Sequence, residues 1–224
     1  MWPASRKRKS QPYWSGASPD WVDIAMVDTN ISFQQAFKLF DAANAEDPRT
    51  EVHEGKPYPQ ELLYAQRMTA WLEKFEPNAS EALQLAVRAQ HICRWKIPRN
   101  QYPMDRDGYK RWRTALGKMH GEIASNIMRQ AGCREELCLR VKSLLMKEPQ
   151  TLAEQDGQTL EDVICLVFLE FYFVPFAAQY SPQKLTSIVR KTWKKMSARG
   201  QQTALTLAPS WPSDLLVIVQ QAIA

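Results

Sequence analysis

Apolar residues recur every three or four positions along most of this chain, and prolines separate the stretches in which they do so. Phe33, Phe37 and Phe40 begin the pattern, and such spacing places apolar side chains on one face of an α-helix. Glycine is scarce, with 8 residues among 224, and the apolar residues favour Leu, Ala, Met and Trp over β-branched types. Both features argue against a turn-rich β architecture. The sequence therefore predicts an all-α fold, a compact multi-helix single domain.

Capping and stop signals divide this domain into helices. Ser32 with Gln35 forms a capping box that predicts the first helix, and Pro59 suits the first turn of the second, after a loop over 45–58. The last expected helix begins at Pro212, although its core, Leu215–Val219, also fits a strand. The remaining helices are expected over 78–95, 107–130, 134–147, 181–200 and from 151 into the apolar run around 168, with an ordered loop at 96–106.

The first 25 residues lack this pattern. They contain several prolines and the basic run Arg6–Lys9, so we expect residues 1–25 to be a disordered basic tail, or an over-long gene start, before a domain at 26–224. A nuclear-import-like signal is the functional alternative for the basic run. The tail holds nearly half of the formal net charge of +5. Charge alone therefore does not predict a nucleic-acid-binding domain in the rest of the chain.

The four cysteines form no C-x-x-C pair, and most lie in apolar helical stretches. We expect free thiols in a reducing compartment, no disulfides and no cysteine-bound zinc. The longest apolar run, Val163–Ala178, contains Glu170 and Pro175 and is shorter than the ~20 residues that a membrane span needs. No apolar core follows the basic run near the N-terminus either. We therefore expect a cytoplasmic protein without a membrane partner.

Glu170 is the first unusual residue, because it stands in the apolar run where a helix offers no polar face. A buried carboxylate must be paired, bind a metal or stay protonated. Asp162 lies about 80° away around a regular helix, so both carboxylates are expected to face one cavity. A structural salt bridge to an arginine is the alternative to a catalytic or ligand-binding role.

Residues 88–113 are rich in arginine and aromatic side chains. Guanidinium groups bind phosphates and carboxylates through paired N–H donors and stack on rings, so this mixture suits an anionic, partly planar ligand. Solvated arginines around a structural tryptophan are the alternative. The ligand-binding candidates in this segment are Arg94, Trp95, Arg99 and Arg113, with Arg99 expected at the rim of the pocket.

His91 and His120 are two of only three histidines, and each falls on a helix face that is expected to point inward. Either one alone would fit a histidine of the core. Together with Asp162 and Glu170 they would form an acid–base pair or a site for a divalent metal. These four residues are therefore the catalytic candidates and the candidate metal ligands.

Several ungapped blocks of this sequence resemble the domain-of-unknown-function 4202 family. The resemblance extends over roughly residues 32–205 and leaves residues 1–25 outside. The family implies no particular reaction. The blocks are residues 89–99, 102–104, 108–113, 158–162, 167–170 and 191–197.

A more distant resemblance is to the His-Asp (HD) metal-dependent phosphohydrolases, which are all-helical. Their histidine, His-Asp pair and late aspartate would fall on Arg67, on His91 with Ile92, and on Asp162. Arg67 and Ile92 depart from that pattern. Either His120 and Glu170 replace the missing ligands, or the site is a metal-free pocket in which arginines hold an anion.

Together these features predict a central polar pocket that Arg67 lines along with the catalytic and ligand-binding candidates. The function expected from it is hydrolysis of a phosphorylated or otherwise anionic small molecule. The arginines would bind the anion, with or without a divalent metal. One alternative is a binding protein without catalysis, for RNA or an anionic ligand, in which Arg190–Lys195 and the segment 94–113 would supply phosphate contacts and stacking surfaces. The other is an interaction scaffold.

Overall fold

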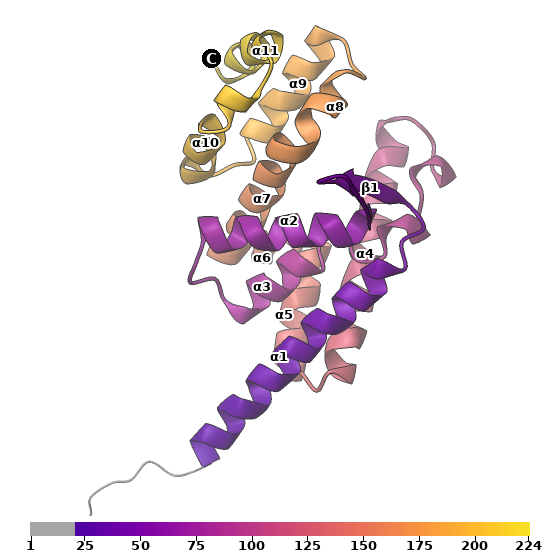
Figure 1. Cartoon of the computed structure of the whole chain (residues 1–224), viewed down its shortest axis with the longest axis vertical. Coiled ribbons are helices and arrows are strands. Elements are labelled where there is room, and N and C mark those ends of the chain that lie inside the picture. Colours follow the sequence, from indigo (N-terminus) through magenta and orange to yellow (C-terminus); the bar gives the residue numbers. More distant parts are fainter. Residues whose placement is uncertain (1–20) are drawn as a thin grey trace, which may run out of the picture.

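The structure, a computed structural model, describes the backbone of residues 21–224 and the side chains from residue 30 onward. Eleven α-helices and one two-stranded sheet make up this part of the chain, which confirms the predicted all-α fold (Figure 1). The helices are α1 (Trp21–Ala45), α2 (Gln60–Phe75), α3 (Glu81–Arg88), α4 (Arg106–Gln130), α5 (Glu135–Met146), α6 (Pro149–Leu152), α7 (Gln155–Val167), α8 (Phe173–Ala177), α9 (Pro182–Trp193), α10 (Ala198–Leu205) and α11 (Ser213–Ile223).

Helix α1 begins earlier than the sequence predicted. Ser32 and Gln35 lie inside it, so the expected capping box is wrong. Capping bonds form where a helix leaves backbone donors unpaired, and that position is not the start of this helix. Of the expected tail, residues 1–20 lie outside the described residues, and 21–25 belong to α1.

The first and the last helices lie at opposite ends of the molecule. In Figure 1, α1 extends away at one end of the molecule, α9, α10 and α11 gather at the other, and α2 lies across the middle. Helices α4 and α5 pack as a hairpin. Gly132, with φ of 84°, ends α4 as predicted, because a left-handed residue suits a helix C-terminus.

A β-hairpin occupies the segment that was predicted to be a loop before α2. Strands β1 (Thr50–His53) and β2 (Lys56–Pro59) pair antiparallel, with Thr50 opposite Pro59. Glu54 and Gly55 form the turn at positive φ. Strands of four residues are too short to give a clear alternating pattern, which is why the sequence did not reveal them.

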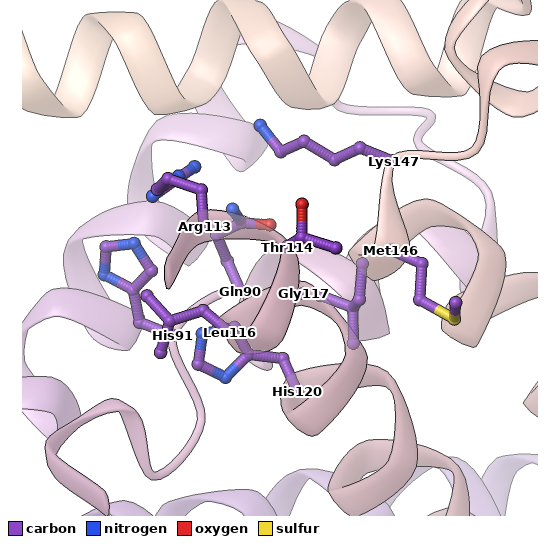
Figure 2. A pocket seen from close by; sticks show the side chains of 10 residues that line it. Gln90, His91, Arg113, Thr114, Leu116, Gly117, His120, Met146 and Lys147 are labelled. Carbon is purple, nitrogen blue, oxygen red and sulfur yellow. The ribbon is translucent and has the colours of Figure 1, made fainter. Parts of the chain in front are cut away.

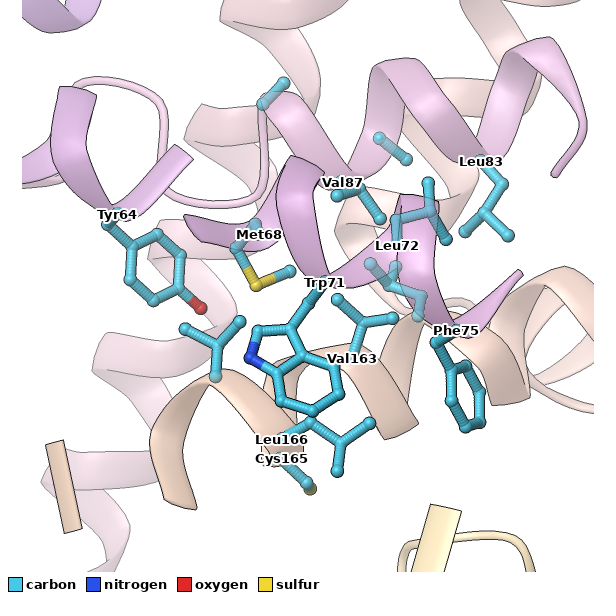
Figure 3. Close-up of a cluster of buried hydrophobic side chains, with 14 of the residues drawn as sticks. Tyr64, Met68, Trp71, Leu72, Phe75, Leu83, Val87, Val163, Cys165 and Leu166 are labelled. Carbon is cyan, nitrogen blue, oxygen red and sulfur yellow. The ribbon is translucent and has the colours of Figure 1, made fainter. Parts of the chain in front are cut away.

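The hydrophobic core lies where α2, α3 and α7 meet (Figure 3). Met68 and Leu72 project into it from α2, Leu83 and Val87 from α3, and Leu166 from α7, all nearly or fully buried. Spacings of three to four residues bring these side chains to one face of each helix. The core fixes α2 and α7, and with them the side chains that these helices present to the neighbouring cavity.

Two expected helices end earlier than their sequence patterns predicted. Helix α3 stops before the left-handed residue Cys93, and the basic helix expected over 181–200 divides into α9 and α10 at Ser197. In each case a distant side chain accepts the freed backbone N–H. Asn44 Oδ1 accepts from Cys93 N at 3.0 Å, and Asp162 Oδ1 accepts from Ser197 N at 2.8 Å.

The C-terminal segment is helical throughout Leu215–Val219, so the strand alternative is wrong there. All four cysteines are free thiols, as predicted. Within residues 21–224, every helix is either too short or too polar to cross a bilayer.

Candidate functional site

A main cavity of about 440 Å³ opens between α2, α4, α7 and α9. Cationic side chains line it together with fewer carboxylates, and the rest of its wall is largely aromatic or apolar. The cations are Arg94, Arg113, Lys147 and Lys195, the carboxylates are Glu61 and Glu161, and the aromatic residues are Tyr64, Tyr109, Phe168, Tyr172 and Phe176.

A side cavity of about 180 Å³ adjoins the main cavity, and His91, Arg113 and Lys147 line both. Thr114 and His120 are among the residues that line the side cavity alone. In Figure 2 the Lys147 side chain reaches across the side cavity toward Arg113, and the two histidine rings lie along its other side. The shared residues make the two cavities neighbouring parts of one site.

The turn after α3 brings His91 and Arg94 to the main cavity. Between them Cys93 has φ of 53° and ψ of 30°, a left-handed conformation that costs a residue other than glycine roughly 1–2 kcal/mol. The fully buried Asn44 of α1 accepts the Cys93 N–H and so holds the chain in this turn. Helix α1 thus positions two site residues without lining the cavity itself.

His91 stacks on Tyr64, with ring centroids 4.0 Å apart and an interplanar angle of 14°. Its Nδ1 lies 3.3 Å from Glu61 Oε2, although the two atoms are not aligned for a hydrogen bond. Burial, and then the charges of Arg94 and Arg113, lower the pKa of His91 well below its ordinary value. The imidazole is therefore neutral at pH 7. The carboxylate beside Nδ1 favours the tautomer with the proton on that atom, which leaves Nε2 as the basic nitrogen.

Arg94 brings into the main cavity a cation that no carboxylate of residues 30–224 contacts. Its Nε is buried and lacks a hydrogen-bond partner among these residues, and its guanidinium carbon lies 5.1 Å from the centroid of the Trp112 ring. Burial lowers the pKa of Arg94, and the nearby charge of Glu61 only partly opposes this. Arg113 likewise makes no ion pair or hydrogen bond within residues 30–224.

Glu61 belongs to a buried network that the sequence analysis missed. Arg49 Nη2 donates to Glu61 Oε1 at 2.8 Å and to Asp47 Oδ2 at 3.0 Å. Burial raises the pKa of Glu61, while the charges of Arg94 and Arg49 act against it. Glu61 therefore interacts with the charge of Arg94 at longer range, but its hydrogen bond is to Arg49 and it makes no ion pair with Arg94.

Lys147 and Glu161 form an ion pair at the boundary of the two cavities. Lys147 directly follows α5 with φ of 57°, an uncommon conformation for a lysine. Burial would raise the pKa of Glu161, but the charge and hydrogen bond of Lys147 hold it below its ordinary value. The pair is therefore charged, and it balances itself rather than the arginines.

Close packing of α4 on α5 brings Arg113 beside Lys147. A Cβ added at Gly117 would lie 3.3 Å from the carbonyl oxygen of Leu145, and one at Gly121 would lie 3.1 Å from side chains of α5. Two glycines one helical turn apart thus let the helices approach. The result is a cluster of cations drawn from two helices.

His120 is buried at the floor of the side cavity, where its Nδ1 lies 2.8 Å from the carbonyl oxygen of Ile92. A carbonyl oxygen only accepts hydrogen bonds, so Nδ1 bears the proton and Nε2 has a free lone pair in the neutral ring. Burial lowers the pKa of His120 to about 3, which keeps the ring neutral at pH 7. The ring centroids of His91 and His120 lie 6.1 Å apart.

Residues 34–217 match the family described as domain of unknown function (DUF4202). The chain belongs to this family. Every residue that lines the main and side cavities falls within the matched range. No curated protein and no solved structure matches the chain.

The four residues that were expected to share one pocket are divided between the two cavities of this family member. His91 and Arg113 line both, Arg94 lines the main cavity, and His120 lines the side cavity. The density of arginine, histidine and aromatic residues over 88–113 was therefore the informative signal.

Asp162 does not reach either cavity. Its carboxylate accepts from the Ser197 backbone N–H at 2.8 Å and from the Ser197 hydroxyl at 2.5 Å, at the start of α10. A Cβ at Gly200 would lie only 2.5 Å from Asp162 Oδ1, so α10 packs directly on this group. The carboxylate that α7 presents to the main cavity is the preceding residue, Glu161.

Glu170 is exposed, contrary to the expectation that it is buried. It lies in a π-helical turn, Phe168–Tyr172, where hydrogen bonds span five residues rather than four. The wider turn shifts the angular positions that a regular helix would give, and Leu169 and Phe173 take the buried positions instead. Glu170 accepts a hydrogen bond from Trp71 Nε1 at the surface.

Three predicted ligand-binding residues stabilise local structure outside the cavities. Arg67 Nη1 donates to Glu51 Oε1 at 2.5 Å and to the Tyr172 hydroxyl at 2.8 Å, so it links β1 to the π-helical turn. Arg99 donates to carbonyl oxygens of the 96–106 loop, among them Tyr102 O at 2.9 Å. Trp95 packs against the core from the turn after α3.

The candidate metal ligands do not converge. Two of them line cavities and two lie elsewhere, and within residues 30–224 no three His, Cys, Asp or Glu side chains are arranged to hold a metal. The uncompensated arginines beside His91 would also repel a cation. The residues present therefore do not fit a divalent metal.

Four charged residues of the main cavity were not among the predicted pocket residues: Glu61, Lys147, Glu161 and Lys195. Each stands among other charged residues in a helix or at a helix end, where a solvated side chain is the usual outcome. Glu61 is buried, Lys147 and Glu161 are half-buried and Lys195 is exposed. Their convergence on one cavity follows from how helices far apart in the chain pack together.

Proposed function

We propose that the main cavity binds a small molecule that combines an anionic group with a planar or apolar portion. The observation that carries this proposal is the pair Arg94 and Arg113, two guanidinium groups on a cavity wall that no carboxylate of residues 30–224 contacts. Cations withdrawn from water cost stability unless an opposite charge approaches them. An anionic ligand supplies that charge.

The rest of the wall suits the planar portion of such a ligand. Tyr109, Phe168 and Phe176 supply aromatic surface beside the cations. The volume of about 440 Å³ lies in the range of about 300–1,000 Å³ that is typical of small-molecule sites. Phe168 and Tyr172, which begin and end the π-helical turn, both line the cavity, and π-helical turns occur frequently at functional sites.

Hydrolysis of the bound anion is a second candidate function, favoured by His91. This imidazole is neutral, and its Nδ1 lies beside Glu61, which leaves Nε2 to accept a proton from water or from a ligand hydroxyl. Arg94 and Arg113 would stabilise negative charge that develops on the ligand. The metal-dependent mechanism implied by the HD resemblance is not proposed, because the donor set does not fit a metal. RNA binding is less favoured, because the unpaired cations line a cavity rather than an exposed face.

Isothermal titration calorimetry at low salt, with inorganic phosphate, pyrophosphate, citrate and AMP, tests the proposal. We expect Arg94→Met to weaken anion binding about 10- to 100-fold, because hydrogen bonds to charged groups contribute about 1.5–3 kcal/mol. Arg111→Met is the matched control, since Arg111 is exposed on α4 and loses the same charge outside the cavities. Absence of binding by all four anions, or an equal loss in both variants, would overturn the proposal. Phosphate release from AMP by the same preparations distinguishes hydrolysis from binding alone.

A further inference from the structure

The side cavity differs from the main cavity in the hydrogen-bonding groups that it offers. Beside Arg113 and Lys147, which only donate, it is lined by His91 and His120, two neutral imidazoles. Their ring centroids lie 6.1 Å apart, so one ligand group of a few atoms spans them. Figure 2 shows both rings at this cavity, together with the hydroxyl of Thr114.

His120 offers the side cavity an acceptor. Its Nδ1 donates to the Ile92 carbonyl oxygen, so Nε2 is the nitrogen with a free lone pair. Within residues 30–224 Nε2 makes no hydrogen bond, and it is not among the fully buried atoms that lack one. It is therefore reachable from the cavity that the ring lines.

His91 offers a second acceptor by the same reasoning. The Glu61 carboxylate lies 3.3 Å from Nδ1 and favours a proton there, so the free lone pair is on Nε2. Nε2 of this ring also has no hydrogen-bond partner within residues 30–224 and is not fully buried. His91 lines both cavities, so this lone pair is available to a ligand that extends from the main cavity into the side cavity.

The imidazole lone pairs disfavour a fully ionised phosphate, the two cations disfavour a metal ion, and together they favour a group with hydroxyls. A fully ionised phosphate brings only acceptors, which repel the imidazole nitrogens. A metal cation would be repelled by Arg113 and Lys147. A group with O–H donors satisfies the imidazoles, and its oxygen atoms also accept from the two cations.

The size of the side cavity agrees with a hydroxylated ring. At about 180 Å³ it exceeds the roughly 150 Å³ of a cavity that holds benzene. Because Arg113 and Lys147 line both cavities, a ligand that enters the side cavity stays within reach of the anion clamp.

We propose that the side cavity is a hydroxyl subsite, and that the ligand of this protein is a phosphorylated sugar, either free or as the ribose phosphate of a nucleotide. This inference rests on the proposed function, because the phosphate occupies the clamp of Arg94 and Arg113 in the main cavity. His91 and His120 accept hydrogen bonds from the sugar hydroxyls. The aromatic wall of Tyr109, Phe168 and Phe176 adjoins the sugar and receives a base where the ligand is a nucleotide.

A pair of ligands with the same ring size tests the hydroxyl subsite in the unaltered protein. Ribose 5-phosphate carries hydroxyls, and cyclopentylmethyl phosphate has none. We expect ribose 5-phosphate to bind about tenfold more tightly by calorimetry, as two or more neutral hydrogen bonds would give. An AMP arm separates the two sources of the sugar, since tighter binding of AMP than of ribose 5-phosphate identifies a nucleotide site.

Variants test whether the preference for ribose 5-phosphate over cyclopentylmethyl phosphate depends on the side cavity. His120→Phe, which keeps a ring but removes the acceptor, should reduce the tenfold preference to less than about threefold and leave binding of cyclopentylmethyl phosphate unchanged. His53→Phe, at the remaining histidine in the β-hairpin, should keep the full preference. If neither phosphate ester binds and the four anions of the first titration also fail, the proposed function fails along with the subsite; if only the two esters fail, the phosphorylated-sugar ligand is overturned. If both bind equally to the unaltered protein, or if His120→Phe retains the preference, the hydroxyl subsite alone is overturned.

Discussion

At the scale of single residues, His120 should make the stability of the protein depend on pH. Its pKa in the folded protein is about 3, against about 6.5 for an ordinary histidine, so between these values the unfolded chain binds more protons. The contribution is fully present above about pH 6.5 and is lost as the pH falls toward 3, at up to about 1.4 kcal/mol per pH unit. We therefore expect His120→Phe to lose stability less steeply than the wild type between pH 6 and pH 4. Urea unfolding at several pH values measures the slope.

His53→Phe serves as the control for this measurement, because it removes a histidine from the hairpin rather than from the side cavity. Carboxylates also titrate in this range, but they are the same in all three proteins. An acid slope in His120→Phe equal to that of the wild type would show that His120 is not buried in its neutral form.

At the scale of helices, Asp162 is expected to contribute more to the stability of the fold than Glu170, although Glu170 was the carboxylate whose sequence position suggested burial. Asp162 is buried and accepts two hydrogen bonds from Ser197 at the start of α10, whereas Glu170 is exposed. We expect Asp162→Ala to lower the free energy of unfolding by about 2 kcal/mol, because it removes the acceptor of two hydrogen bonds from the half-buried Ser197. Glu170→Ala should cost no more than about 1 kcal/mol, as is usual for an exposed side chain. Urea unfolding of the two variants compares them, and a larger loss in Glu170→Ala would contradict the described packing.

The helices themselves were predictable from the sequence, but their breaks were not. The spacing of residues such as Met68 and Leu72 requires only local geometry, and it correctly located the core face of α2. The left-handed turn at Cys93 depends on Asn44, and the start of α10 depends on Asp162. Both partners are distant in the chain, so a local pattern does not reveal them, although Ser197 is itself a common helix N-cap and accepts from Gly200 N at 3.0 Å. The π-helical turn around Glu170 likewise changed the angular position of that residue, and the sequence pattern did not indicate such a turn.

At the scale of the whole molecule, the candidate site could be predicted only in part. His91, Arg94 and Arg113 were found because arginine, histidine and aromatic residues are dense in one segment. Glu61 and Lys147 come from other elements, and each looks like an ordinary surface charge in its own segment. The excess of positive charge in the main cavity is therefore a property of the assembled fold.

That excess should lower the stability of the ligand-free protein. Arg88 and Arg94 form an internal comparison, since Arg88 is buried but bonded to both carboxylate oxygens of Asp41, at 2.7 and 2.6 Å, whereas Arg94 has no such partner within residues 30–224. We expect Arg94→Met to raise the free energy of unfolding by about 1 kcal/mol, because apolar replacement of a poorly compensated buried charge is neutral to stabilising. In a domain of this size that corresponds to a melting temperature about 2–4 °C higher.

Arg88→Met should have the opposite effect and destabilise the protein by about 2 kcal/mol, because it removes charged hydrogen bonds from a pair that is buried on the arginine side and leaves the half-buried Asp41 without its partner. Addition of a bound anion at 100 times its dissociation constant should stabilise the wild type by about 2.7 kcal/mol and Arg94→Met by much less. Differential scanning calorimetry with and without the anion measures both effects. A loss of stability in ligand-free Arg94→Met equal to that in Arg88→Met would mean that Arg94 is a structural ion-pair residue, and the site would then have no uncompensated charge to attract a ligand.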